Sequence, residues 1–258
     1  MDLTELKTVW HLLRGVGADG PLAERLDRFY RPQAGSYDRF RARLLAGRGA
    51  LIAQLRAHLP DGARVVELGA GTGSNATLWG ARLPALHSLE LVDLCPSLLE
   101  QARLRCRPLA NARVIEADAV AYRPAEPVDC VYFSYSLTMM PDWFRALTNA
   151  LAMLKPGGVL GVVDFYVSRS EVEDGRARHN TLTRWLLPRW FRHDGVRLDP
   201  AHLETLETLT DRQFLLEDAT RLPYLPGIHA PYYAYVGIKT GAPRAEAVQH
   251  LWKTLAAS

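Results

Sequence analysis

The fold is decided by one short stretch of sequence, Val65-Val66-Glu67-Leu68-Gly69-Ala70-Gly71-Thr72-Gly73. Its apolar half predicts a buried strand, and its closely spaced glycines predict a sharp turn at which backbone can approach a ligand. Open α/β sheets bind ligands at the carboxyl ends of their strands, which is where such a turn lies. We therefore expect a ligand site that begins at Gly69, Gly71 and Gly73.

The spacing of these glycines distinguishes between cofactors. A dinucleotide fingerprint has the pattern G-x-G-x-x-G, whereas this chain has G-x-G-x-G followed by Ser74. Glu67 precedes the first glycine by two residues, and a carboxylate there suits a ligand with an ammonium group and repels a pyrophosphate. The alternative is a glycine-rich turn that serves only packing.

Short apolar segments alternate with helical ones on the carboxyl side of this stretch. Repeated units of this kind predict an α/β fold, a Rossmann-like parallel sheet with helices on both faces. The expected strands are 63–68, 85–92, 111–116, 128–134, 158–164, 214–218 and 232–238. The expected helices are 3–13, 22–30, 37–59, 74–82, 95–105, 142–154, 201–209 and 245–255.

Length and composition are those of a globular protein with one large domain. The chain has 258 residues with 31 Lys and Arg against 28 Asp and Glu, and 48% of it is hydrophobic, which excludes disordered and collagen-like classes. The predicted organisation is an N-terminal helical cap (1–60), a main domain (61–241) with a basic aromatic insertion at about 168–200, and a C-terminal helix (242–258).

Two further acids follow predicted strands. Asp93 ends the second strand, where a carboxylate can accept hydrogen bonds from both hydroxyls of a ribose. Asp118 comes just after the third strand and can accept a hydrogen bond from an adenine amino group. Because parallel strands end at the same edge of a sheet, both acids are expected beside the glycine turn.

These motifs resemble those of class I S-adenosylmethionine-dependent methyltransferases, from residue 37 to residue 164. The resemblance implies S-adenosylmethionine as cofactor and a seven-stranded sheet whose last strand is antiparallel. It implies that Glu67 and the glycines hold the methionine part, Asp93 the ribose and Asp118 the adenine. Tyr37 resembles a lid residue of related enzymes, or it only packs against a helix. The expected cofactor-binding residues are Tyr37, Arg41, Glu67, Gly69, Gly71, Gly73, Asp93, Asp118, Ala119 and Ser134.

The segment after the fourth strand indicates the substrate class. It reads Phe133-Ser134-Tyr135-Ser136-Leu137-Thr138-Met139-Met140-Pro141-Asp142-Trp143 and lacks the Asn/Asp-Pro-Pro-Tyr motif of nucleobase methyltransferases, so no nucleic-acid substrate is expected. With 163–169 and 224–233, it resembles the diacylglyceryl-homoserine N-methyltransferases of betaine-lipid synthesis. That resemblance implies three methylations of the homoserine amine of a membrane lipid, and a pathway partner that builds this lipid.

The expected catalytic residues are Tyr135, Asp164 and Tyr232. Methyl transfer from a sulfonium requires a positioned, deprotonated amine, and Tyr135 and Asp164 end adjacent strands where they can hydrogen-bond that amine. Asp164 is alternatively a helix cap or a loop ion pair, and His229 is an alternative base. Aromatic faces can hold the methylated product. The candidates are Tyr135, Trp143, Tyr166, Tyr232 and Tyr233.

The segment from Arg176 to His193 carries five arginines and no acid, interleaved with leucine and tryptophan. This pattern suits the surface of an anionic membrane, and alternatively a cap helix whose arginines face water. The chain shows no signal peptide and no apolar run long enough to span a bilayer. We expect a cytoplasmic protein, peripheral at the inner membrane surface, with three reduced cysteines and no metal site.

Two other functions fit the same cofactor motif. One is a methyltransferase of a soluble small-molecule amine or quinone precursor, in which the basic segment is only a lid. The other is a cofactor-binding subunit without catalytic activity. The motif itself predicts cofactor binding in all three cases, and the sequence carries no prediction of oligomeric state.

Overall fold

The computed structural model describes residues 20–31, 44–193, 195–222 and 227–241. Its centre is a seven-stranded sheet with the strand order β3-β2-β1-β4-β5-β7-β6. β7 is antiparallel to both of its neighbours, and the other pairs are parallel, which confirms the expected methyltransferase-type sheet. The strands are β1 (Arg64–Leu68), β2 (Ser88–Asp93), β3 (Ala112–Glu116), β4 (Val128–Ser134), β5 (Leu154–Phe165), β6 (Asp211–Arg221) and β7 (His229–Ile238).

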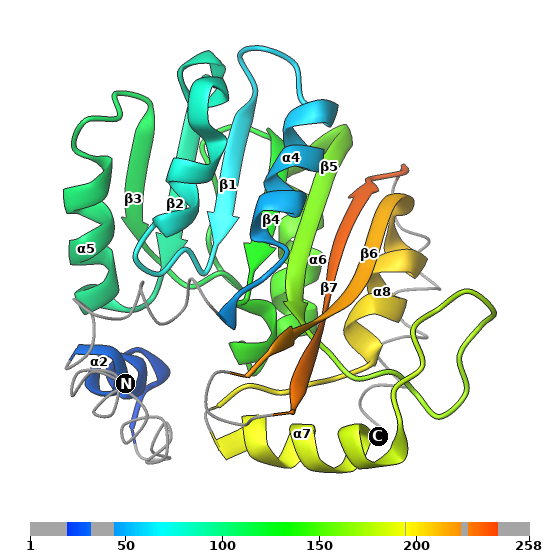
Figure 1. Cartoon of the computed structure of the whole chain (residues 1–258). Coiled ribbons are helices and arrows are strands. Elements are labelled where there is room, and N and C mark those ends of the chain that lie inside the picture. Colours follow the sequence, from blue (N-terminus) through cyan, green and yellow to red (C-terminus); the bar gives the residue numbers. More distant parts are fainter. Residues whose placement is uncertain (1–19, 32–43, 194, 223–226, 242–258) are drawn as a thin grey trace.

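Helices cover both faces of this sheet (Figure 1). They are α2 (Leu22–Tyr30), α4 (Arg48–His58), α5 (Pro96–Cys106), α6 (Trp143–Met153), α7 (Thr181–His193) and α8 (Ala201–Leu209), with 3₁₀ helices η2 (Ser74–Ala85) and η3 (Leu137–Met139). None of these helices is both long and apolar enough to cross a bilayer. The predicted helices at 3–13 and 245–255 lie outside the described residues.

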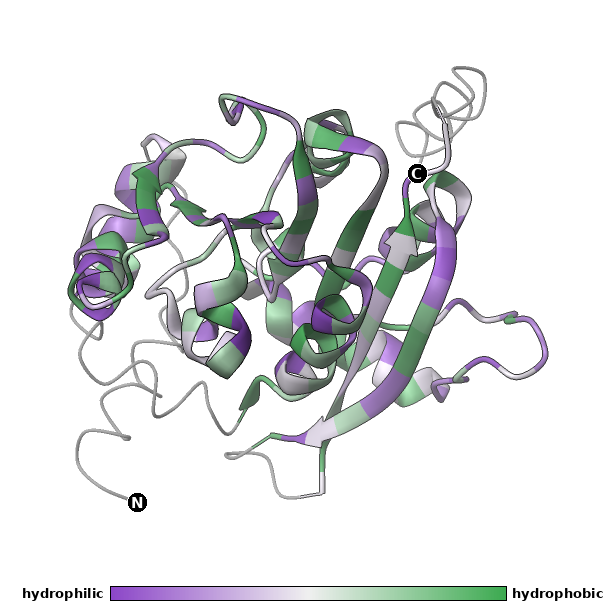
Figure 2. Cartoon of the chain, turned by 90° about the horizontal axis from the view of Figure 1, so that it is seen from above, coloured by the Kyte–Doolittle hydropathy of each residue, from purple (hydrophilic) through white to green (hydrophobic). Residues whose placement is uncertain are grey.

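The alternation of side chains along the strands builds two cores. In β4, Cys130 and Tyr132 pack with α4, η2 and α7, whereas Val131 and Phe133 pack with α6 and α8. Strands buried on both faces need apolar residues at every position, which is why the inner strands have continuous apolar runs. Seen from above, the strands in the middle are mainly green and peripheral segments carry most of the purple (Figure 2).

α4 packs directly on one face of the central sheet. A Cβ at Gly161 in β5 would lie 2.9 Å from Leu55 and 3.1 Å from Leu51, so the helix rests directly on the strand. The predicted cap at 1–60 therefore ends in a helix of the main domain. Within the described part of the predicted helix 37–59, α4 begins only at Arg48, after a turn in which Gly47 has a φ of +76°.

The insertion at 168–200 is more regular than its sequence suggests, because it contains α7. Asn180 caps this helix by accepting a hydrogen bond from the Thr183 N–H at 2.8 Å. Leu187 and Phe191, one turn apart, are buried against the body of the domain. The three cysteines, Cys95, Cys106 and Cys130, are buried and unpaired.

Candidate functional site

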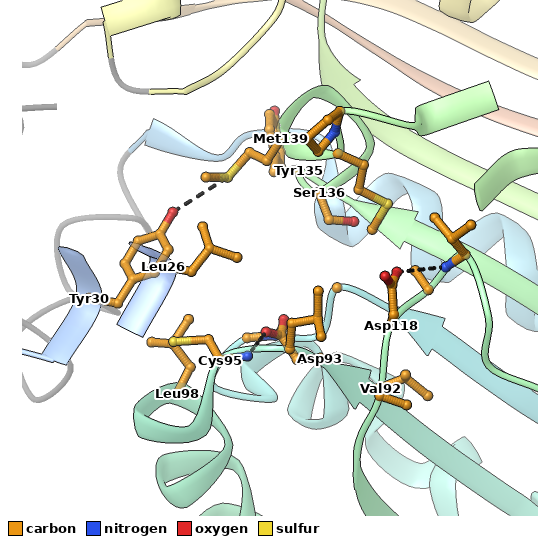
Figure 3. Close-up of a pocket in the computed structure, with 18 of the residues that line it drawn as sticks. Leu26, Tyr30, Val92, Asp93, Cys95, Leu98, Asp118, Tyr135, Ser136 and Met139 are labelled. Carbon is orange, nitrogen blue, oxygen red and sulfur yellow. Dashed lines mark hydrogen bonds between the residues drawn. The ribbon is translucent and has the colours of Figure 1, made fainter. Parts of the chain in front are cut away.

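A hollow lies at the carboxyl ends of β1, β2, β3 and β4, bordered by α2, by the start of α5 and by residues 135–142 (Figure 3). Its volume is about 860 Å³ when the part open to solvent is included. Its walls combine the glycine turn, the ends of the strands and one face of α2. The lining residues are Leu26, Tyr30, Gly69, Gly71, Val92, Asp93, Leu94, Cys95, Leu98, Ala117, Asp118, Ala119, Val120, Tyr135, Ser136, Met139, Met140, Pro141 and Asp142.

The glycine turn forms the floor of the hollow. Gly69, Gly71 and Gly73 have φ angles of +75°, +54° and +67°, which side chains disfavour. A Cβ at Gly69 would also lie 2.3 Å from the Cβ of Ser136, so no other residue fits between the turn and the β4 loop. Gly69 and Gly71 line the hollow, while Gly73 packs below it against Leu91.

Asp93 holds the turn and faces the hollow at the same time. One carboxylate oxygen accepts a hydrogen bond from the Gly71 N–H at 2.7 Å, and the other accepts one from the Cys95 N–H at 2.8 Å. Each oxygen of a carboxylate has further lone pairs, so the group retains capacity for ligand hydroxyls. The predicted ribose acceptor is therefore rigidly oriented before any ligand binds.

The loop after β3 forms the opposite wall and is fixed from α6. The buried amide of Asn149 donates hydrogen bonds to the carbonyl oxygens of Ala119 and Tyr122, at 2.7 and 3.0 Å. Asp118 accepts a hydrogen bond from the Val120 N–H at 2.9 Å. Asp118 and Ala119 both line the hollow at the positions expected for adenine contacts.

Glu67 lies beneath the turn, outside the walls of the hollow. Its carboxylate is fully buried and accepts hydrogen bonds from the Asn75 amide at 2.6 Å and the Tyr132 hydroxyl at 2.7 Å. Burial raises the pKa of Glu67 to about 7, against the opposing effect of these bonds and of nearby Arg48. The structure thus gives Glu67 a supporting position where the sequence predicted direct contact with the ligand.

Tyr135 has a strained backbone directly after β4. With a φ of +54°, it is the one non-glycine residue of the described chain with a positive φ. Such a conformation costs on the order of 1–3 kcal/mol, and residues of this kind cluster at functional sites. Its N–H bonds the Val163 carbonyl and its hydroxyl donates to the Ala46 carbonyl, both at 2.7 Å. Tyr135 lines the hollow, and its catalytic role stays a prediction.

Asp164 does not reach the hollow. Its fully buried carboxylate accepts hydrogen bonds from the Thr138 N–H and hydroxyl, at 3.1 and 2.7 Å, and from the Phe165 N–H at 2.9 Å. Burial raises the pKa of Asp164 to about 6. The group holds the 137–139 turn, whose Met139 lines the hollow, so the structure places it as a positioning residue.

Tyr232 lies near Tyr135 but outside the walls of the hollow. Its hydroxyl donates to Asp218 at 3.2 Å. A Cβ at Gly47 would lie 2.5 Å from its ring, so Tyr232 packs on the turn whose Ala46 carbonyl accepts from Tyr135. The turn before α4 thus joins two of the three predicted catalytic residues.

Several other predicted residues lie elsewhere. Ser134 is buried, with no hydrogen-bond partner for its hydroxyl, and Ser136 lines the hollow in its place. Tyr37 and Arg41 lie outside the described residues. Among the aromatic candidates, Tyr233 is fully buried and Tyr166 donates its hydroxyl to Glu217. Neither of them lines the hollow, nor do Trp143 and His229.

α2 borders the hollow, although its sequence was not expected to contribute to the site. Leu26 and Tyr30 close one side of the hollow, and the Tyr30 hydroxyl donates to the Met139 sulfur at 3.4 Å (Figure 3). Asp27 docks the helix by accepting a hydrogen bond from the Ser97 N–H at 3.1 Å. The amphipathic pattern of 22–30 predicted a helix, but only the folded chain shows what that helix covers.

The charge of the walls restricts the ligand. Among the described lining residues, three are acids (Asp93, Asp118 and Asp142) and none is Lys, Arg or His. The thioethers of Met139 and Met140 complete an apolar, polarizable wall. These groups suit a cationic ligand with hydroxyl and amino donors. No group of three or more metal-ligating side chains is found within the described part of the chain.

Comparison with known proteins points to one family. Residues 37–212 match the family described as "Methyltransferase domain". A trans-aconitate 2-methyltransferase of Enterobacter sp. (strain 638) is 36% identical over 107 residues, which are 42% of this chain and 41% of that protein. The chain thus matches about two fifths of the length of this curated relative.

Solved structures agree on the fold. The N-methyltransferase NodS from Bradyrhizobium japonicum WM9, in complex with S-adenosyl-L-homocysteine, has a TM-score of 0.58 at 15% identity and covers 93% of this chain and 100% of its own. The [4+2]-cyclase SpnF has a TM-score of 0.61 at 20% identity, and the match covers 87% of this chain and 99% of SpnF. Proteins described by different reactions share this fold, so the reaction must be argued from the site.

Proposed function

The chain belongs to the methyltransferase-domain family, and from that premise we propose that it is an S-adenosylmethionine-dependent N-methyltransferase of a lipid amine. The proposed acceptor is the homoserine amino group of diacylglyceryl-homoserine, which three transfers convert to a trimethylammonium group. The support is the chemistry of the hollow, together with the sequence resemblance to betaine-lipid methyltransferases.

The hollow fits the cofactor. Asp93 and Asp118 offer oriented carboxylates to ribose hydroxyls and an adenine amino group, and the glycine turn allows close approach of the methionine part. S-adenosylmethionine, when bound, supplies an electrophilic methyl group on a sulfonium. Acidic and thioether groups around the hollow stabilise a cation there.

Tyr135 is the residue best placed to orient the acceptor amine. Its hydroxyl proton points to the Ala46 carbonyl, so its oxygen lone pairs can accept an N–H from the amine. The cofactor would supply its methyl group to the amine lone pair that Tyr135 orients. The proton released after each of the first two transfers would pass to solvent, and the third transfer would yield the quaternary product.

One observation carries the proposal, namely that no cationic side chain occurs among the described lining residues of the hollow. A site without cationic side chains suits an acceptor that carries an amino group. It disfavours trans-aconitate, the acceptor named in the curated relatives, since a tricarboxylate requires cationic partners. The identity to those relatives, over two fifths of their length, supports methyl transfer more strongly than it supports their substrate.

The test is a competition between acceptors. The purified protein is incubated with S-adenosylmethionine and either diacylglyceryl-homoserine in mixed micelles or trans-aconitate, and both products are followed by mass spectrometry. Successive gains of one, two and three methyl groups on the lipid are expected, with no methyl ester of trans-aconitate. Methylation of trans-aconitate alone, or cofactor binding without transfer to either acceptor, would overturn the proposal.

A further inference from the structure

One helix presents large apolar side chains to solvent. Of the five large hydrophobic residues that are exposed in the described chain, three lie on α7. They are Leu182, Trp185 and Trp190, with exposed fractions of 65%, 54% and 42%. Exposed apolar groups gathered on one element, two of them tryptophans, mark an interaction surface.

The exposed groups form one continuous face. At about 3.6 residues per turn, Leu182, Trp185, Leu186 and Arg189 lie above one another, with Trp190 and Arg192 at the two borders. Leu187 and Phe191 point the opposite way and are buried. We call the six outward residues the α7 face: Leu182, Trp185, Leu186, Arg189, Trp190 and Arg192.

The charge on this face is uniformly positive. α7 contains no Asp or Glu, and no ion pair joins Arg189 or Arg192 to a carboxylate of the described residues. The Arg189 guanidinium lies 4.6 Å from the centroid of the Trp185 ring. By contrast, Arg176 before the helix is committed to Glu207 and Glu217 at 2.8 and 2.9 Å, and Arg184 turns its buried Nε toward the body.

The side of α7 opposite the α7 face packs toward the candidate active site. Phe191 packs against Phe165 with ring centroids 5.0 Å apart, and Phe165 packs against Tyr135 at 4.6 Å, with the rings tilted in both pairs. The Arg197 N–H, just beyond the helix, donates to the Thr138 carbonyl at 2.8 Å. Figure 1 shows α7 beneath the carboxyl ends of the central strands, the edge at which the hollow opens.

We infer that the α7 face docks on an anionic lipid bilayer, with the helix parallel to the membrane and its leucines and tryptophans in the interface. The inference rests on the proposed function and adds to it the surface from which the lipid substrate is taken. Aromatic and leucine side chains enter the headgroup region, while arginines meet anionic phosphates and contribute about fivefold in affinity each. A lipid held there lies at the same edge of the sheet as the hollow.

The test uses the full chain and two matched variants. The α7 variant combines Leu182→Ser, Trp185→Ser, Arg189→Glu and Arg192→Glu. The control combines Leu78→Ser and Leu104→Ser, at leucines that are 37% and 49% exposed, with Arg103→Glu in α5 and Arg107→Glu just after it. Binding is measured by flotation with vesicles of phosphatidylcholine alone or with about a third phosphatidylglycerol. S-adenosylmethionine affinity is measured by calorimetry for each protein.

We expect wild type and control to float with the anionic vesicles, and the α7 variant to lose at least tenfold in partitioning with unchanged cofactor affinity. Equal flotation of all three proteins would overturn the inference. A second result would also overturn it: wild type sediments as a dimer, the α7 variant sediments as a monomer, and neither binds vesicles. The α7 face would then join two copies of the chain. Vesicle binding without methylation of the homoserine lipid would overturn the proposed substrate and leave the docking surface standing.

Discussion

The carboxylate of Asp164 receives two hydrogen bonds from Thr138, one from its N–H at 3.1 Å and one from its hydroxyl at 2.7 Å. This pair ties the end of β5 to the 3₁₀ turn that follows β4. The next residue in that turn, Met139, lines the hollow and accepts the hydrogen bond of Tyr30. Asp164 therefore acts on the site through the turn that it holds.

Thr138→Val should destabilise both the protein and the hollow. The substitution keeps the shape but removes one donor from a fully buried carboxylate, which costs about 1.5–3 kcal/mol of unfolding free energy. Urea denaturation measures this cost, and calorimetry should show weaker S-adenosylmethionine binding because Met139 loses its anchor. Thr208→Val is the control, because Thr208 is an exposed position of α8 whose hydroxyl donates to the Glu204 carbonyl within the same helix. Equal losses in the two variants would contradict the positioning role.

Gly69→Ala should be far more costly than Gly62→Ala. Both glycines have positive φ, +75° and +73°, so each alanine carries a similar backbone strain of about 1 kcal/mol. A Cβ at Gly62 meets nothing within 4 Å, whereas one at Gly69 would overlap Ser136 at 2.3 Å. Overpacking should add about 1–3 kcal/mol to the loss of unfolding free energy. Identical urea midpoints for the two variants would show that the close approach to Ser136 is not required.

Asp93→Asn should weaken cofactor binding by at least about tenfold, or roughly 1.4 kcal/mol. An amide has one acceptor oxygen, so it cannot accept hydrogen bonds from both the Gly71 and the Cys95 N–H as the carboxylate does. It also lacks the negative charge that strengthens hydrogen bonds from ribose hydroxyls. Glu116→Gln is the matched control, because that carboxylate lies opposite Asp93 in the β2–β3 register but outside the hollow. Calorimetry with S-adenosylmethionine decides: an unchanged dissociation constant for Asp93→Asn would refute the ribose assignment.

The stability of wild type relative to Glu67→Gln should decrease as pH rises from about 4.5 to 7. Burial raises the folded-state pKa of Glu67 from 4.5 to about 7, so the folded protein holds a proton there that the unfolded chain has released. The stabilisation that Glu67 gains from this bound proton is complete below about pH 4.5 and is lost as the pH rises through about 7. Urea denaturation at about pH 4.5, 6 and 7.5 measures the difference. Parallel stability curves for the two proteins would show that Glu67 titrates normally.

Local sequence sufficed for the central fold. β4 has the predicted bounds of 128–134, and the glycine turn, Asp93 and Asp118 lie together as expected. The physical reason is that apolar runs, glycine spacing and alternation of strand and helix are local signals, and parallel strands place all their carboxyl ends at one edge.

Tertiary structure decided which polar groups reach that edge. Glu67 and Asp164 come from the same strand ends as their neighbours, yet both are buried and bonded by Asn75, Tyr132 and Thr138. Pleat, twist and the packing of distant segments set the direction of each side chain, and one position along a strand reverses the face.

The same division holds for α2 and α7. The periodicity of 22–30 predicted α2, since periodicity is a property of neighbouring residues, whereas the sequence was not assigned a helix at 181–193, where the structure has α7. Only the folded chain decided that α2 closes the hollow and that Leu187 and Phe191, and not Trp185 and Trp190, face the body. A helix face is chosen by the shape and polarity of the surface it meets, and that surface is built from segments far away in the sequence.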